Sequence, residues 1–337
     1  MGERPTQPAL RTADCHNDLL LGVLHQRERG LEDPFGDFWL PQLQAGGVVV
    51  QVLPIYIEEQ FVGEGALRRS MLLVEEAWRI ATEHAEHVRI CLTGADIHEA
   101  IDQGRIALIL ALEGSEPIGN DLALLQVFHR LGLRMMALSW NRRTMMADGV
   151  GERDTGGRLT RLGVDAIAEM EHLGIVLDVS HLSESGFWHV DEVATKPYIA
   201  SHSSCRALQD HPRNLRDAQL EAVAASGGFV ALNAFGAFLA DEPSVTAFLA
   251  HVQHAVDLIG ADRVALGNDF IYDLSTVVDP ILGGALIDIQ DLPWVEDLLR
   301  PADLAELAGR LHATLGASDG EAVAWKTLAH RLAHLLP

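Results

Sequence analysis

RIALILALEG, residues 105–114, is a nearly continuous run of Ile, Leu and Ala that ends on a glutamate and a glycine. Such a run is typical of a strand buried on both faces, because neither side of the strand contacts water. Seven further runs have this character, and segments with helical spacing lie between them. They cover residues 10–14, 46–57, 133–140, 174–180, 197–203, 227–235 and 263–270. Buried strands that alternate with helices predict a parallel sheet covered by helices on both faces.

Eight such strands favour an α/β fold of the closed (β/α)8 or TIM barrel type, although an open doubly wound sheet would share most of the pattern. Two observations favour the barrel. No GxGxxG or P-loop motif follows the first strand, and polar side chains gather at the ends of the strands. Helices are predicted over residues 65–84, 121–131, 161–172, 217–225 and 244–259.

The chain has 337 residues and contains no Pro/Gly/Ser-rich linker and no internal repeat. We therefore expect residues 1–337 to form a single barrel domain, in which residues 291–337 are a helical extension packed on the barrel. Two histidine pairs with helical spacing are expected on exposed helix faces. They are His251 with His254 and His330 with His334.

The charge balance argues against two classes of partner. Lys and Arg number 25 against 48 Asp and Glu, a net charge of −23. Nucleic acids and anionic membranes attract clustered positive charge, so neither is an expected partner. No run is long enough for a transmembrane helix, and the N-terminus lacks the apolar core of a signal peptide. Cys15, Cys91 and Cys205 form no CxxC motif, which suits a reducing compartment and predicts a cytoplasmic protein.

The segment ADCHNDLL, residues 13–20, places His16 and Asp18 two positions apart after the first predicted strand. In an extended chain, residues at this spacing point to the same side, so both groups can face one metal ion. A helix cap made by the polar residues of this segment is the alternative explanation. The remaining strands decide between the two.

Further metal-compatible side chains follow the other strands. Glu113 ends residues 105–114, His181 follows 174–180, His202 lies in 197–203, and Asp269 lies in 263–270. The carboxyl ends of the strands of a barrel meet on one face, where the active sites of this fold lie. Together with His16 and Asp18, these groups predict a site for two divalent ions with nitrogen and oxygen ligands.

These motifs resemble those of the membrane (renal) dipeptidase family of metallopeptidases, the M19 branch of the amidohydrolase superfamily. The matching segments are DCHND, LEGSEPIGNDLALL, LDVSHLS, ASHSSCRAL, HPRNL and GNDF, in order from about residue 13 to 275. The resemblance implies a (β/α)8 barrel, two zinc ions and the hydrolysis of dipeptides, often with tolerance for a D-residue at the C-terminal position. It also implies a homodimer.

The family's site residues carry over motif by motif. His16 and Asp18 would bind the first zinc, Glu113 would bridge both ions, and His181 with His202 would hold the second. Asp269 matches the acid/base aspartate, which takes a proton from the attacking water and returns it to the leaving amine. Arg213, in HPRN, matches the residue that receives the α-carboxylate of the dipeptide, which a guanidinium binds in bidentate fashion.

One departure from the family stands out. Relatives carry a Thr-His pair after the fourth predicted strand, and its imidazole supports the oxyanion. Here the stretch reads ALSWNRRTMMAD, so Trp140 occupies that position. An indole donates one hydrogen bond and carries no positive charge, so the oxyanion would depend more on the metal ions and on Asn141 or Arg142. The segment 271–284 also lacks the family's usual Asp-Gly, which predicts a reshaped pocket wall.

The Trp140 change leaves three interpretations open: a subfamily with different substrates, a weaker dipeptidase, or an inactive relative. The presence of every predicted metal ligand favours the first. The leading hypothesis is a zinc-dependent dipeptidase-like hydrolase that acts on a small amide with a free carboxylate. Its rivals are an N-acyl amino acid or lactone hydrolase with the same metals, a catalytically silent metal-binding protein, and a metal-free structural barrel.

Overall fold

The structure, a computed structural model, describes residues 10–274 and 293–337. Each of the eight predicted apolar runs contains a strand. The strands are β1 (Thr12–Asp14), β2 (Val48–Tyr56), β4 (Ile106–Glu113), β5 (Leu133–Ala137), β6 (Val176–Asp178), β7 (Tyr198–Ile199), β8 (Val230–Leu232) and β9 (Val264–Leu266). All the strand pairs are parallel, in the order β1-β2-β4-β5-β6-β7, with β8 paired to β9.

Two junctions close these strands into a barrel. Ala200, just after β7, forms a parallel bridge with Val230 of β8. At the other edge, the backbone N–H of Cys15 donates to the carbonyl of Leu266 in β9 at 2.8 Å. The predicted (β/α)8 barrel is therefore confirmed. A further strand, β3 (Val88–Ile90), was not predicted, because its sequence VRI carries a charged residue, Arg89, in the middle and so does not form a continuous apolar run.

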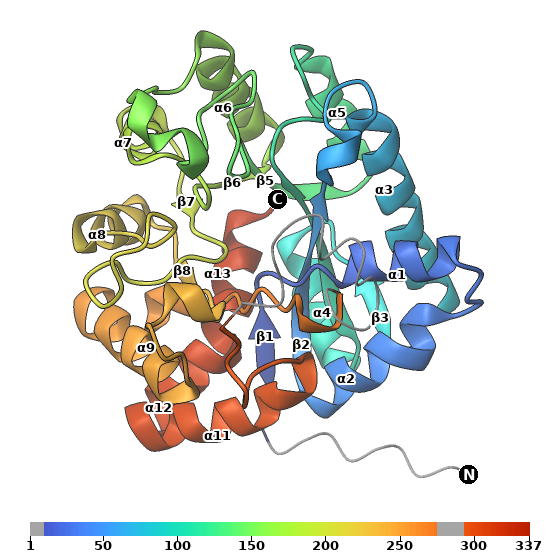
Figure 1. The fold of residues 1–337 in the computed structure, drawn as a ribbon. Coiled ribbons are helices and arrows are strands. Elements are labelled where there is room, and N and C mark those ends of the chain that lie inside the picture. The colour runs from blue at the N-terminus through green and yellow to red at the C-terminus, as the bar shows by residue number, and fades with distance from the viewer. Residues whose placement is uncertain (1–9, 275–292) are drawn as a thin grey trace.

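Helices surround the strands, as Figure 1 shows. The five predicted helices are present as α3 (Ala66–Glu83), α5 (Ala123–Arg130), α6 (Arg161–Leu173), α8 (Asp217–Ser226) and α9 (Val245–Ile259). The other α-helices in the described residues are α1 (Leu19–Glu28), α2 (Leu40–Ala45), α4 (Gly94–Asp102), α7 (Glu184–Val193), α11 (Leu304–Leu315), α12 (Ala317–Glu321) and α13 (Thr327–Leu335). Among the described residues, no helix combines the length and apolarity needed to cross a membrane.

Two expectations need correction. Residues 293–300, at the start of the predicted helical extension, contain one turn and no helix, and helical structure begins at Pro301. His251 is not on an exposed face: it is 1% exposed. Its two ring nitrogens contact the backbone N–H of Cys205 and the carbonyl of Leu239, both at 3.0 Å. Burial is possible because both polar atoms of the ring have partners.

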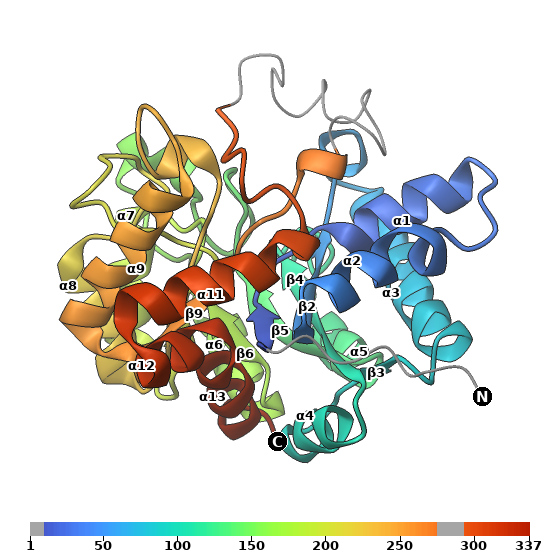
Figure 2. The ribbon, with the colours of Figure 1, turned by 90° about the horizontal axis from the view of Figure 1, so that it is seen from below.

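Alternation along the strands positions the site. On β4, Ala107, Ile109 and Ala111 lie in the core inside the barrel, and the even-numbered residues pack outward toward the helices. Glu113 continues the inward series at the carboxyl end of the strand. At the opposite end, α4 and α13 pack together and contribute Ile97, Leu328 and Leu332 to the same core (Figure 2). One end of the barrel is thus closed by apolar residues, and the polar groups lie at the other.

Candidate metal centre

The structure brings all six predicted metal-site and acid/base side chains together at the carboxyl end of the barrel. His16 Nε2 is 4.0 Å from an oxygen of Asp18, 3.7 Å from Oε2 of Glu113 and 3.9 Å from Oδ1 of Asp269. His16, Asp18 and Asp269 offer ligand atoms that all lie within 4.8 Å of one another. We call these three residues the first donor group.

A second donor group, Glu113, His181 and His202, adjoins the first. Oε1 of Glu113 is 2.9 Å from His181 Nε2 and 3.6 Å from His202 Nε2, and these two nitrogens are 2.7 Å apart. Glu113 therefore directs one carboxylate oxygen toward each group. This is the arrangement expected of a carboxylate that bridges two ions.

Two observations indicate that these residues fit divalent ions: some of their polar atoms lack hydrogen-bond partners, and their donor atoms are of the right chemical type. His16 Nε2 and Asp18 Oδ1 are buried and have no hydrogen-bond partner. Unpartnered buried polar atoms are costly, and imidazole nitrogen with carboxylate oxygen suits zinc and similar metals. The site also contains more acidic than basic groups, so cations would offset charge that the fold has buried.

Burial shifts the titration of both donor groups. It raises the pKa of Asp18 and Glu113 well above their ordinary values, and the neighbouring carboxylates add to this shift. It lowers the pKa of His181 and His202 well below the usual value, so both imidazoles are neutral. Neutral imidazole is the form that binds a metal, and a bound cation would favour ionised carboxylates.

These shifts predict how the stability of the metal-free protein depends on pH. We expect its free energy of unfolding to fall as the pH rises above about 6.5. Burial raises the pKa of Asp14 from 3.8 to about 7, and those of Asp18 and Glu113 rise well above 3.8 and 4.5. Each of these carboxyls costs the folded state nothing at a pH below its pKa in the unfolded chain, and its full cost is reached above its pKa in the folded protein. The site histidines have lowered pKa values, so they make stability rise with pH, but only up to their unfolded pKa of 6.5.

Denaturant titration of chelator-treated protein at about pH 6.5 and about pH 8.5 measures this effect. Saturating zinc should remove most of the loss, because bound cations stabilise ionised carboxylates. A metal-free protein whose unfolding free energy rises over this interval would contradict the prediction.

Both histidines of the second donor group form a hydrogen bond through Nδ1, the ring nitrogen that does not face Glu113. His181 Nδ1 donates to the side-chain oxygen of Asn141 at 2.8 Å. Ser201 Oγ gives its single proton to Asp178, so His202 Nδ1 donates to Ser201 Oγ, at 2.7 Å. Each contact places the ring proton on Nδ1 and leaves the Nε2 lone pair facing Glu113. Such outer partners orient metal-binding histidines in many proteins.

We expect Asn141→Ala to weaken zinc binding at the second donor group by about 10- to 100-fold, the usual cost of losing such a partner. Without the amide oxygen, His181 is free to rotate and to exchange its ring proton between nitrogens. Competition titration with a chromophoric chelator measures the affinity, with exposed Asn120→Ala as the matched control. Equal zinc affinity in the two variants would show that Asn141 does not position His181.

Backbone conformation also sets the site apart. Among the described residues other than glycine, His181 and Asp269 alone have positive φ angles, 68° and 62°. This left-handed region costs a non-glycine residue free energy, although Asp, Asn and His tolerate it better than most. The backbone strain thus falls on two predicted site residues. The backbone N–H of Asp269 donates to the carbonyl of His16 at 3.0 Å, and this bond joins the segment after β9 to the segment after β1, where the barrel closes.

Two asparagines support the carboxylates. Asn233, after β8, donates from Nδ2 to Oδ2 of Asp269 at 3.0 Å. Asn268 donates its backbone and side-chain N–H groups to Oδ1 of Asp14, at 2.8 and 2.9 Å. Asp14 is fully buried at the end of β1, so these bonds replace the water it has lost. The contacts fix the orientation of Asp269 and of the segment that carries it.

Arg213 lies against the second donor group and is 5% exposed. Its Nη2 donates to His181 Nε2 at 3.0 Å and to the carbonyl of His202 at 3.2 Å, while its Nε has no partner. Burial lowers the pKa of Arg213 to about 10, so the guanidinium remains charged at neutral pH. A cationic group with an unused N–H at this position is suited to a substrate carboxylate.

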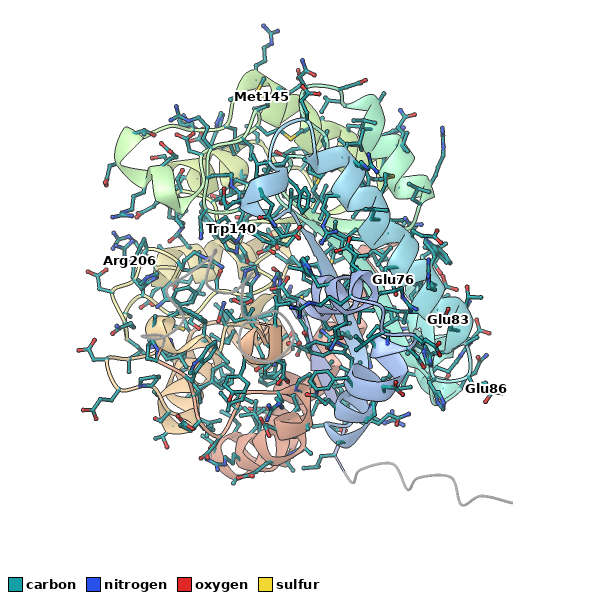
Figure 3. The ribbon with its side chains drawn as sticks, turned by 45° about the vertical axis from the view of Figure 1, so that its right-hand side comes forward. Glu76, Glu83, Glu86, Trp140, Met145 and Arg206 are labelled. Atoms are coloured by element: carbon teal, nitrogen blue, oxygen red, sulfur yellow. The ribbon has the colours of Figure 1, made fainter. Side chains whose placement is uncertain are left out.

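Trp140 forms a packed wall at the mouth of the site. Its ring centroid is 5.2 Å from that of Tyr56 and 5.8 Å from that of His181. The guanidinium of Arg142 lies 4.9 Å from the Trp140 ring centre, and Arg142 also pairs with Glu116 and Glu59. In Figure 3, Trp140 lies inside the outline of the molecule, whereas Met145 on the same loop lies at the edge. Cation–π contact and ion pairs hold the indole in place.

The outer partners Asp178, Ser201 and Asn233 were missed by the sequence analysis. A signal for two of them existed, because Asp178 in LDVSH and Asn233 in ALNAF end apolar runs just as Glu113 does. Of the segment 271–284, for which a reshaped pocket wall was predicted, residues 275–284 lie outside the described part of the chain.

Solved structures with this architecture include two metallopeptidases. One, from Rhodobacter sphaeroides and liganded with a phosphinate mimic of the dipeptide L-Ala-D-Ala, is 26% identical and has a TM-score of 0.83, over 96% of this chain and 98% of that one. The other, dipeptidase AC of family M19, is 27% identical with a TM-score of 0.84, over the same shares of the two chains.

The chain is also similar in sequence to curated proteins. An uncharacterized protein in the pqqA 5′ region of Klebsiella pneumoniae is 34% identical over 68% of this chain and 86% of its own length. Dipeptidase verJ of Clonostachys rogersoniana is 30% identical over 61% of this chain, and the match spans about half of verJ, 53%. The sequence model described as membrane dipeptidase (peptidase family M19) matches residues 3–299. This chain therefore belongs to the membrane dipeptidase family, peptidase family M19.

Proposed function

We propose that this chain is a zinc-dependent dipeptidase that cleaves the amide bond of small dipeptides, including those with a D-residue at the C-terminal position. The observation that carries the proposal is the position of Glu113. Its Oε2 is 3.7 Å from His16 Nε2 in the first donor group, and its Oε1 is 2.9 Å from His181 Nε2 in the second. The dipeptide mimic bound to the Rhodobacter relative supports the same substrate class for this chain.

In this proposal, His16, Asp18 and Glu113 hold one zinc ion, and Glu113, His181 and His202 hold the other. When bound, the two ions would activate a water molecule and polarise the substrate carbonyl. Asp269 accepts the proton of the attacking water and returns it to the amine that leaves. Asn233 keeps the carboxylate of Asp269 in one orientation by its bond at 3.0 Å.

Arg213 is proposed to receive the α-carboxylate of the dipeptide, and Trp140 with Asn141 and Arg142 to line the carbonyl side. The well-packed indole and the complete set of donors support a subfamily with its own substrates rather than an inactive relative. The absence of the family histidine supports one alternative, hydrolysis of an N-acyl amino acid or a lactone by the same centre.

Metal analysis coupled to a substrate screen tests the proposal. Purified protein should contain about two zinc ions per chain and hydrolyse members of a library of dipeptides with L- and D-residues, in preference to N-acyl amino acids and lactones. Two zinc ions with no turnover of any dipeptide would overturn the dipeptidase assignment. Protein that binds no divalent metal would overturn the metal centre itself.

Replacing Arg213 by lysine should raise KM for the best dipeptide by about tenfold or more, because an ammonium does not reproduce a bidentate pair. The same dipeptide with an amidated C-terminus lacks the carboxylate and serves as the control. Steady-state kinetics should therefore show a large loss on the free acid and little change on the amide. An equal loss on both would assign Arg213 to the metal centre instead.

Two finer proposals concern the whole protein. Resemblance to the family supports a homodimer. Size-exclusion chromatography with light scattering measures the molar mass in solution and distinguishes a dimer from a monomer. The free and buried states of Cys15, Cys91 and Cys205 support a reducing, cytoplasmic location. Fractionation of cells that express the full chain tests the location directly.

A further inference from the structure

His251 is a buried histidine of α9 that the proposed mechanism does not use. The backbone N–H of Cys205 donates to its Nδ1 at 3.0 Å, so Nδ1 carries no proton. The ring proton is therefore on Nε2, which donates to the carbonyl of Leu239 at 3.0 Å. Burial lowers the pKa of His251, which favours this neutral form. The imidazole thus joins two backbone segments, one before β8 and one after it.

The first of these segments is the loop of residues 203–215, which carries Arg213. Cys205 forms a parallel bridge with Leu215. Two backbone hydrogen bonds, 2.8 and 2.9 Å long, join Leu215 to the neighbours of Cys205 on either side. Cys205 Sγ also donates to the backbone carbonyl of His251, at 3.4 Å. Because Leu215 comes two positions after Arg213, the backbone that His251 holds is paired with the backbone from which Arg213 extends.

The second segment is a short 3₁₀ helix, η4 (Gly236–Phe238), which ends next to Leu239. The ring centre of Phe238 lies 5.6 Å from the guanidinium carbon of Arg213. The carbonyl of Phe238 accepts from Asn214 Nδ2 at 2.7 Å, so η4 also holds the residue that follows Arg213. A cation–π contact and a hydrogen bond to the adjacent residue both restrict where the guanidinium can lie.

Arg213 depends on such packing for its orientation. Its Nη2 contacts His181 Nε2 and the carbonyl of His202, while its Nε is buried and has no hydrogen-bond partner. With that N–H unused, the direction of the guanidinium plane is set by the loop that carries it and by the ring beside it. His251 is bonded to the backbone of both.

We propose that His251 is a positioning residue for substrate binding, which holds the 203–215 loop and η4 at the spacing that directs Arg213 to the α-carboxylate of the dipeptide. This inference rests on the proposed dipeptidase function. The hydrogen bonds of His251 reach Cys205 and Leu239 rather than Arg213, so it acts through the backbone. A bidentate pair forms only when the guanidinium plane faces the carboxylate, and a small displacement is costly.

The kinetic test is His251→Ala, which should raise KM for the best dipeptide by about tenfold and change kcat by less than about twofold. The same dipeptide with an amidated C-terminus lacks the carboxylate, so its KM should not change. His251→Asn keeps an acceptor for Cys205 N–H and loses the donor to Leu239. Its KM for the free acid should rise by about threefold, and it tests the inference even if the alanine variant does not fold.

His254→Ala is the matched control, because His254 lies three positions further along α9 and its side chain is 28% exposed. It should leave both KM values unchanged. An NMR signal gives a readout that needs no turnover. The Nε–H signal of Arg213, assigned by its absence from Arg213→Lys, should shift or broaden in His251→Ala and keep its position in His254→Ala. All the His251 and His254 variants should retain about two zinc ions per chain.

The outcomes separate this inference from the proposed function. An unchanged KM and an unchanged Arg213 signal in the His251 variants would overturn the inference while the dipeptidase function stands. Equal losses on the free acid and the amide, or a loss of zinc, would also overturn it, because His251 would then support the fold or the metal centre in general. A parent protein that cleaves no dipeptide would overturn the dipeptidase function, and the Arg213 signal would still decide whether His251 positions that side chain.

Discussion

Glu113→Gln should remove stable binding of a pair of zinc ions and lower kcat/KM for the best dipeptide by about a thousandfold or more. Glu113 belongs to the second donor group, where its Oε1 is 2.9 Å from His181 Nε2, and its Oε2 also faces the first group, 3.7 Å from His16 Nε2. A glutamine keeps one acceptor oxygen and replaces the other with an amide NH2, which cannot bind a cation. The side chain keeps its size, so the loss reports on charge and ligation.

The same substitution should separate metal binding from stability. Burial and the nearby carboxylates raise the pKa of Glu113 well above its ordinary value, which means that its ionised form is unfavourable in the metal-free chain. Gln at this position should therefore leave the unfolding free energy of the metal-free protein unchanged or raise it. Zinc at 100 times its Kd stabilises a protein by about 2.7 kcal/mol per site, and the variant should lose most of that gain.

Elemental analysis and thermal unfolding with and without zinc measure these effects. Exposed Glu64→Gln is the matched control and should retain two ions and full turnover. Two zinc ions per chain together with unchanged turnover in Glu113→Gln would show that this carboxylate is not a shared ligand. A large loss of metal-free stability would instead give Glu113 a structural role.

The parts of the fold that follow from local sequence were predicted correctly. Runs such as residues 105–114 are apolar because both faces of the strand are buried, so the strands and their order in the chain can be read directly. The six candidate site residues were singled out for a related reason. Each lies at, or within four positions of, the end of such a run, and a parallel barrel brings all these ends to one face.

The parts that depend on contacts between distant loops were not predicted. Asn141 meets His181 across 40 positions, and Asn233 meets Asp269 across 36. Nothing in the spacing of either pair announces the contact, because loop conformation decides it. His251 shows the same limit: its helical spacing suggested an exposed face, while partners from two other segments allow it to be buried.

Asp269→Asn should lower kcat by about 100- to 10,000-fold, the range expected for loss of a general acid/base. Asparagine is the right substitution because it disturbs little else. It tolerates the positive φ of 62° at this position, where alanine would add strain. Its side-chain oxygen can still accept from Asn233 Nδ2, which now bonds to Asp269 at 3.0 Å. An amide, however, neither takes the proton of the attacking water nor returns it to the amine.

Metal content decides how the loss in Asp269→Asn is explained, because Asp269 Oδ1 also lies 3.9 Å from His16 Nε2. If Asp269 transfers protons, the variant keeps about two zinc ions per chain and its KM changes little while kcat falls. If Asp269 is a ligand, one ion is lost and added zinc partly restores turnover. Asn233→Ala then provides a graded comparison: a positioning residue should cost about tenfold in kcat with both ions retained, since the carboxylate survives but loses its fixed orientation. Full activity in Asp269→Asn would assign the proton transfer to another group.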